Sequence, residues 1–226
     1  MRLVGLTGGI ASGKSTTSKL LRREGITVLD CDEIAHAVVR KGRWGWRRVV
    51  KEFGQEVLLP DGELDRKKLG QIVFDDASKR KVLNRATHIP VYAELLRQIL
   101  WSWLLCKWLV VVDMPLLFET GSNKWLKPCV LVYTDQGTQV RRLIARNQLT
   151  PEEALKRVNA QMAMDDKLAR ADEVVDNNGG QEELEKQVVA LATRLKSGAQ
   201  WPGLLWSPVT VGGVLLVLAA TLLRGG

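Results

Sequence analysis

Residues 8–15 constrain this chain more than any other stretch. They read Gly-Gly-Ile-Ala-Ser-Gly-Lys-Ser and match the pattern G-x-x-x-x-G-K-[ST] without a gap. An apolar run, Leu3–Leu6, precedes the match, and a helical pattern follows it from Lys14 to Glu24, where Gly25 stops it. A strand, a Gly-rich loop and a helix in this order predict a phosphate-binding P-loop.

Each residue type in the loop has a physical role. Glycines let main-chain N–H groups approach a phosphate closely, at the positive end of a helix dipole. Lys14 is expected to contact the β- and γ-phosphates of ATP, and the Ser15 hydroxyl to ligate Mg²⁺. The alternative is a Gly-rich turn that binds nothing. The predicted ATP-binding loop comprises Gly8, Gly9, Ile10, Ala11, Ser12, Gly13, Lys14, Ser15 and Thr16.

Short apolar runs alternate with helical patterns along the rest of the chain. This alternation predicts an α/β fold, with a P-loop NTPase-type parallel sheet flanked by helices. Ligands of such sheets bind beyond the carboxyl ends of the strands. After Leu3–Leu6, strands are expected at 26–29, 109–112, 130–133 and 173–175, and helices at 138–146, from the Thr150 cap, and at 181–196.

The segment between the second and third strands is predicted to be mainly helical. Turn signals occur at Gly42, Gly45, Gly54 and Pro60-Asp61-Gly62.

Two aspartates follow the second predicted strand at its carboxyl end. If period-two alternation continues, Asp30 and Asp32 face the same way. A carboxylate there can orient an acceptor hydroxyl and take its proton, and Asp32, farther out, is the preferred base. The alternative is that either residue only caps the helix that begins near Glu33. Asp113 closes the third strand, either as a Walker-B carboxylate or as a strand end.

A basic helix and a highly charged helical segment follow the fourth strand. Arg142 and Arg146 are four residues apart, so they should project from one face and could clamp a phosphoryl group; solvated surface arginines are the alternative. Arg157, Gln161 and Lys167 lie in the charged segment, which is predicted to be a lid over ATP or a plain surface hairpin.

Composition narrows the partners and the compartment. The formal net charge is +8, but the basic residues form separate clusters, so a nucleotide is favoured over nucleic acid. Three cysteines without zinc-ligand spacing make a disulfide framework improbable, and the amino terminus has no signal-peptide pattern. We expect the cytoplasm or the cytoplasmic face of a membrane.

Several phrases together resemble the dephospho-CoA kinase family of P-loop kinases. Beside the P-loop, they are D-x-D-x-x-A at Asp30–Ala35, P-L-L-F-E at Pro115–Glu119 and A-D-x-V-x-D-N at Ala171–Asn177, in this order. The match runs from Met1 to about Lys196. The resemblance implies transfer of the γ-phosphoryl group of MgATP to the ribose 3′-hydroxyl of dephospho-CoA, by a fold with a lid and a helical acceptor-binding region.

Site roles are carried over by motif. The resemblance implies Asp32 as base, Lys14 as phosphate lysine and Arg142 as a catalytic, phosphate-binding arginine. The family usually shows His-Pro where this chain reads His88-Ile89-Pro90. The remaining implied contacts are Arg146 and Asn177 with ATP, and Asp32, His88, Leu117 and Glu119 with the acceptor.

These inferences divide the chain. The kinase domain is expected over residues 1–196, with a core at 1–35 and 105–196, an acceptor-binding insertion at about 36–104 and a lid at about 147–170. Residues 197–203 would be a linker. Residues 204–223 are mostly apolar, and 20 helical residues span about 30 Å, so a C-terminal membrane anchor of a eukaryotic type is favoured over a helix docked on the core.

Two other functions fit the P-loop. One is another small-metabolite or nucleoside-monophosphate kinase, which would share the same loop and lid. The other is a nucleotide-dependent switch at a membrane, against which the lack of a guanine-specifying N-K-x-D phrase counts.

Overall fold

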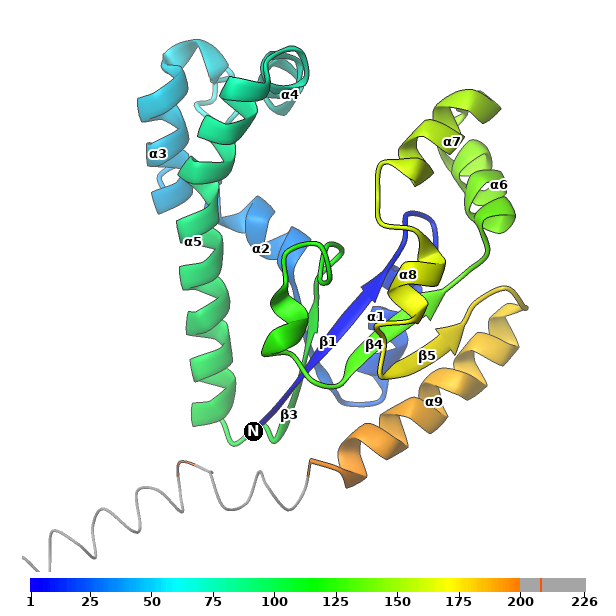
Figure 1. The fold of residues 1–226 in the computed structure, drawn as a ribbon. Coiled ribbons are helices and arrows are strands. Elements are labelled where there is room, and N and C mark those ends of the chain that lie inside the picture. Colours follow the sequence, from blue (N-terminus) through cyan, green and yellow to red (C-terminus); the bar gives the residue numbers. More distant parts are fainter. Residues whose placement is uncertain (200–207, 209–226) are drawn as a thin grey trace, which may run out of the picture. The chain divides into compact units, whose positions relative to one another are not determined.

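The computed structural model describes residues 1–199 and residue 208, apart from the side chain of Asp75. The chain divides into two compact units (Figure 1). The first comprises Met1–Leu29 and the residues from Trp101 onward, and the second comprises Asp30–Leu100. The sequence placed residues 30–35 with the sheet, whereas the structure clusters them with the helical unit.

The first unit is built on a five-stranded sheet in the order β2-β3-β1-β4-β5. β1 pairs in parallel with β3 and β4, and β4 pairs in parallel with β5. This is the α/β architecture expected from the alternation of strands and helices. The strands are β1 (Arg2–Gly8), β2 (Thr27–Asp30), β3 (Leu109–Asp113), β4 (Cys129–Tyr133) and β5 (Glu173–Asp176).

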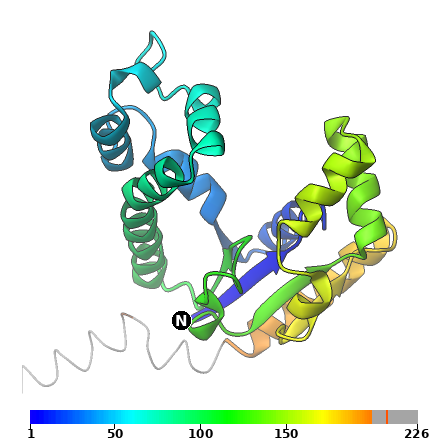
Figure 2. The ribbon, with the colours of Figure 1, turned by 45° about the horizontal axis from the view of Figure 1, so that its top comes forward.

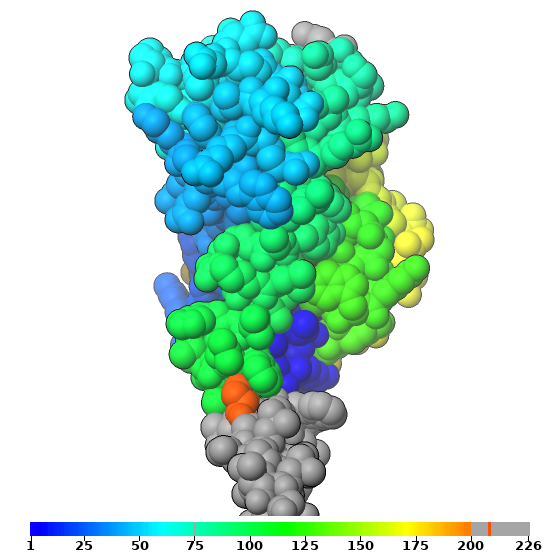
Figure 3. All heavy atoms as spheres, turned by 90° about the vertical axis from the view of Figure 1, so that its left-hand side faces the viewer, coloured from blue at the N-terminus to red at the C-terminus, as the bar shows by residue number. Residues whose placement is uncertain are grey.

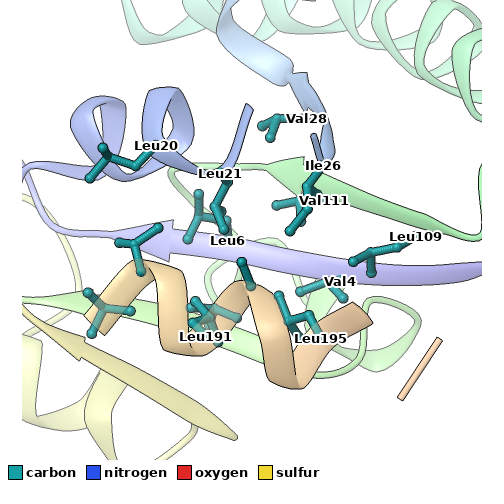
Figure 4. Packing of buried hydrophobic residues seen from close by; sticks show 14 of the residues in the cluster. Val4, Leu6, Leu20, Leu21, Ile26, Val28, Leu109, Val111, Leu191 and Leu195 are labelled. Atoms are coloured by element: carbon teal, nitrogen blue, oxygen red, sulfur yellow. The ribbon is translucent and has the colours of Figure 1, made fainter. Parts of the chain in front are cut away.

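The core of the first unit lies between the sheet and two helices, α1 (Lys14–Arg23) and α9 (Gln181–Ser197). Figure 4 shows Leu21 of α1 and Leu191 of α9 reaching Leu6 of β1. Alternate residues of β1 face the other side, where the Leu117 side chain packs over Gly5 so closely that a Cβ there would collide with it. The period-two pattern of β1 thus separates two packed layers.

Three further helices follow β4 in the first unit. α6 (Gln136–Asn147) and α7 (Pro151–Asn159) lie side by side, and α8 (Met164–Leu168) lies near β4 (Figure 2). Thr150 caps α7 as expected, because its hydroxyl accepts a hydrogen bond from Glu153 N while the Glu153 carboxylate accepts one from Thr150 N. A short 3₁₀ turn, η2 (Ser122–Lys124), lies between β3 and β4.

The second unit is helical, as predicted. One cluster of its core contains six buried side chains: Val49, Phe53, Val57, Leu64, Leu69 and Ala86. Figure 3 shows residues 31–60, in blue to cyan, beside the green surface of α5. The elements are α2 (Cys31–Val38), α3 (Trp44–Phe53), η1 (Gln55–Val57), α4 (Arg66–Asp75) and α5 (Ala77–Leu104), whose last residues belong to the first unit.

One local expectation in the second unit was wrong. Gly45 is not in a turn but in the first turn of α3, where a Cβ would lie 2.7 Å from the Val38 carbonyl oxygen. Close packing, and not turn geometry, therefore requires this glycine. Pro90 lies inside α5, which continues through it.

Candidate functional site

The P-loop connects β1 to α1, as the sequence predicted. Gly13 has φ +90°, which favours glycine, and a Cβ on it would collide with the Asn177 side-chain amide. Asn177 Nδ2 donates a 2.7 Å hydrogen bond to the Ser12 carbonyl oxygen. Asn177, which the resemblance implies as an ATP contact, therefore lies directly against the P-loop and holds it in place.

Lys14 begins α1 and forms an ion pair with the Asp113 carboxylate at the end of β3. Asp113 is completely buried, and its other oxygen accepts a 2.5 Å hydrogen bond from Ser18 Oγ. Burying a carboxylate requires such partners, because its desolvation is otherwise costly. The structure therefore places Asp113, at the end of β3, in direct contact with Lys14 of the P-loop. Ser15 and Thr16 are exposed in the first turn of α1.

A pocket of about 490 Å³ opens beside the P-loop. Arg142 reaches it from α6, and its Nη2 donates a 2.9 Å hydrogen bond to the Asn177 carbonyl oxygen. Three cationic side chains, from Lys19, Arg23 and Arg142, line the pocket together with Ala11, Gly13 and Thr16. Such a basic lining next to a helix N-terminus suits a phosphorylated ligand.

Sequence reasoning missed Lys19 and Arg23. Lys19 follows Thr16 by three residues and Arg23 follows it by seven, so all three lie on the same face of α1. That spacing was visible in the sequence, but only the pocket distinguishes these cations from solvated ones. Arg146, one turn after Arg142, is exposed and donates a hydrogen bond of 2.9 Å to the Asn147 side chain.

Both main-chain polar groups of Ile10, its N–H and its carbonyl oxygen, are hydrogen-bonded to glutamine side chains. Its N–H donates to Gln161 Oε1, and its carbonyl oxygen accepts from Gln139 Nε2, each at 2.8 Å. Gln139 is buried on α6, and Gln161 follows α7. The sequence pointed to Gln161 only as part of the lid, and it gave no signal for Gln139.

The loop after β3 contains two predicted acceptor residues with different surroundings. Leu117 is completely buried, and Glu119 lies partly exposed with its Oε1 2.9 Å from Lys167 Nζ. Lys167, in the segment predicted to be either a lid over ATP or a plain surface hairpin, is completely buried in α8. Its ammonium is therefore paired with Glu119 and is not a solvated surface charge.

Asp32 and His88 lie in the second unit. β2 ends at Asp30 and α2 begins at Cys31, so the period-two argument for Asp30 and Asp32 fails. Asp30 caps α2, because its Oδ1 accepts hydrogen bonds from Asp32 N at 2.8 Å and Glu33 N at 3.1 Å. Asp32 is in the first turn of that helix. His88 is exposed on α5, with its ring 4.5 Å from that of Tyr92.

Within residues 1–199, no helix combines the length and the apolar character that a membrane span requires. Apart from residue 208, the predicted anchor at 204–223 lies outside the described residues, as does most of the predicted linker.

Comparisons with known proteins show which family the chain resembles. The family model for dephospho-CoA kinase matches residues 2–183. The chain is 48% identical over 201 residues to the dephospho-CoA kinase of Arabidopsis thaliana, covering 89% of this chain and 87% of that protein.

Solved structures resemble the fold as well. A crystal structure from Thermus thermophilus has 36% identity and a TM-score of 0.72, over 86% of this chain and 97% of that one. A dephospho-CoA kinase from Campylobacter jejuni has 27% identity and a TM-score of 0.67, with the same coverage. With its P-loop, its Lys14–Asp113 pair and these similarities, the chain belongs to the dephospho-CoA kinase family, a family of ATP-using phosphotransferases.

Proposed function

We propose that the protein transfers the γ-phosphoryl group of ATP to the ribose 3′-hydroxyl of dephospho-CoA. The observation that carries this proposal is the Lys14–Asp113 pair beneath a loop whose geometry requires glycine at position 13. Together with the family match over residues 2–183, it supports a phosphoryl-transfer site rather than a Gly-rich turn.

The donor side of the reaction uses residues of the first unit. Lys14 exchanges its contact with Asp113 for the β- and γ-phosphates when ATP binds. Arg142 neutralises charge that spreads over the transferring phosphoryl group. The remaining residues of the Gly8–Thr16 loop supply main-chain N–H groups, while Arg146 and Asn177 contribute to ATP binding from α6 and the end of β5.

The acceptor side depends on Asp32. The 3′-oxygen attacks the γ-phosphorus, the bond from that phosphorus to the ADP oxygen breaks, and the hydroxyl proton passes to the Asp32 carboxylate. His88, Leu117 and Glu119 are proposed to contact dephospho-CoA. Leu117 is also buried against Gly5, so in addition to that contact it helps to hold the 115–119 loop in shape.

The residues at the P-loop fit Mg²⁺. Ser15 presents an exposed hydroxyl, and Asp113 offers a carboxylate at the end of β3. Among the described residues there is no group of three acidic, His or Cys side chains, which agrees with an ion held largely by substrate phosphates and water. When bound, Mg²⁺ neutralises phosphate charge. We propose Ser15 as its protein ligand.

A coupled assay of ADP release tests the proposed substrate. ATP consumption should depend on dephospho-CoA and should not be stimulated by AMP, shikimate or nucleosides. The matched negative control is Lys14→Ala under the same conditions. Turnover with AMP or shikimate but not with dephospho-CoA would assign a different kinase activity to the same site.

Residues 204–223 are proposed to attach the protein to a membrane. The support is the sequence alone: a mostly apolar stretch about 30 Å long as a helix, preceded by Trp201 and followed by Arg224. Flotation with vesicles compares the full chain with a chain ending at Ser197. Equal flotation of both chains would remove the anchor.

A further inference from the structure

Residues 161–167 touch two loops of the first unit that are far apart in sequence. This segment, which we call the bridge, connects α7 to α8 and includes most of α8. At one end it contacts the P-loop, and at the other it contacts the loop that follows β3. No P-loop pattern predicts either contact.

The contact with the P-loop is specific. Gln161 Oε1 accepts the hydrogen bond from Ile10 N at 2.8 Å, while Gln139 holds the carbonyl oxygen of Ile10 from the opposite side. Met164 of the bridge packs so closely on Gly9 that a Cβ there would lie 2.7 Å from its sulfur. The bridge therefore helps to fix the direction of the Ile10 N–H group, two residues after Gly8, the first residue of the P-loop.

The contact with the second loop is an ion pair. Lys167 is completely buried, and its ammonium lies 2.9 Å from Glu119 Oε1, with no hydrogen bond of good geometry at Nζ among the described residues. Met162 N also donates to Glu119 Oε1, at 3.4 Å. A buried ammonium is costly unless it stays paired, so Lys167 strongly favours the arrangement in which Glu119 stays close.

We propose that the bridge couples the P-loop to the loop after β3, residues 115–119, which contains Glu119. Gln161 and Lys167 are its positioning residues. This inference rests on the proposed function, since Glu119 is a proposed acceptor contact. When the P-loop is held by Gln161, Glu119 is held by the same short segment. Phosphoryl transfer then proceeds with both loops in place, and water is a poorer competitor for the phosphoryl group.

The first test is Gln161→Ala, assayed for transfer and for ATP hydrolysis without acceptor. Loss of one hydrogen bond changes an equilibrium or rate constant by about two- to tenfold, so we expect kcat for transfer to fall by that factor. The KM for ATP should change by less than about twofold, and hydrolysis should not fall in parallel. The ratio of transfer to hydrolysis therefore decreases.

Gln136→Ala is the matched control. Gln136 Nε2 donates a 2.9 Å hydrogen bond to the Asn159 side chain, so this variant also breaks one glutamine contact in the α6–α7 pair but leaves the P-loop untouched. Its transfer-to-hydrolysis ratio should equal that of the wild type. An equal loss of both activities in Gln161→Ala, or the same ratio in both variants, would overturn the coupling.

Amide hydrogen exchange tests the coupling without reference to any reaction. Gln161→Ala should raise exchange in residues 116–121, although the hydrogen bond of the Gln161 side chain is to Ile10 of the P-loop. Lys167→Met should conversely raise exchange in residues 9–13. If each change stays at its own end of the bridge, the proposal is wrong even if the enzyme works. If wild-type protein does not phosphorylate dephospho-CoA, the proposed function fails while the exchange result still stands.

Discussion

The two units differ in how their residues are held. In the first unit, 17 buried side chains pack between five strands and two helices, and the buried Asp113 is fully engaged by Lys14 and Ser18. In the second unit the cluster that contains Val49 and Phe53 has six buried side chains, and the candidate residues Asp32 and His88 are exposed. Preorganised groups stabilise charge most effectively when they are buried and fixed.

The difference suggests a division of labour. In the proposed reaction, the first unit supplies the residues that bind ATP, several of which are already buried or hydrogen-bonded, and the second unit supplies the proposed base Asp32. Substitutions in each unit should therefore affect different steps.

The largest expected effect comes from Asp32→Asn. Loss of a general base typically costs about 10² to 10⁴ in rate, so turnover should fall by this factor. Because Asp32 belongs to the second unit, ATP affinity should remain unchanged when measured by calorimetry. Glu33→Gln, the neighbouring residue on α2, is the control. Near-normal turnover in Asp32→Asn would remove this residue from the reaction.

Lys14→Ala should instead affect both steps. Removing a cation that contacts the phosphates should reduce kcat by about 10² and weaken ATP binding as well. The buried Asp113 also loses its ion pair, so the variant should melt at a lower temperature. Lys186→Ala, an exposed lysine of α9, is the control for charge. An unchanged kcat/KM for ATP in Lys14→Ala would contradict the phosphate contact.

A pair of core substitutions compares the stability of the units. Leu191 is 0% exposed in the first unit and Leu69 is 7% exposed in the second. Replacing a buried leucine by alanine costs about 2–5 kcal/mol, and we expect Leu191→Ala near the upper end and Leu69→Ala near the lower.

Amide hydrogen exchange resolves where each change acts. Leu69→Ala should increase exchange within residues 30–100 and leave ATP binding intact, whereas Leu191→Ala should weaken ATP binding too. Equal increases throughout the chain in both variants would mean that the units unfold together.

The smallest expected effect is a pH dependence of the second unit. The hydrogen bond from Arg97 lowers the pKa of Glu94 to about 2, from an ordinary value of 4.5. Because the folded-state pKa is depressed, the stabilisation is present above pH 4.5 and is lost as the pH falls toward 2. Arg97 is 64% exposed, so the contribution is below about 1 kcal/mol.

In Glu94→Gln, the stability of the second unit should fall less steeply as the pH is lowered (the acid limb) than in the wild type. Amide hydrogen exchange or near-UV circular dichroism follows this unfolding. Glu185→Gln, an exposed glutamate of α9, should leave that limb unchanged. If Glu94→Gln leaves the acid limb as steep as in the wild type, the pair does not contribute to stability.

The sequence by itself determined the local elements of the first unit. The P-loop, its strand and its helix could be predicted because each depends on neighbouring residues: glycines for backbone angles, periodic apolar residues for burial, and Thr150 for a helix cap. All five strands begin and end within two residues of their predicted positions, and the largest difference is at the carboxyl end of β1, which continues to Gly8 instead of ending at Leu6.

Only the tertiary structure decided which of these residues meet. Lys167 is buried with Glu119, which is 48 residues earlier in the sequence, next to its ammonium. Ile10 is hydrogen-bonded to Gln139 of α6 and to Gln161, which follows α7. The role of Gly45 was misjudged for the same reason, because its close contact with the Val38 carbonyl oxygen is not visible in the local pattern. Burial and pairing depend on the whole packed chain, and no short stretch of residues encodes them alone.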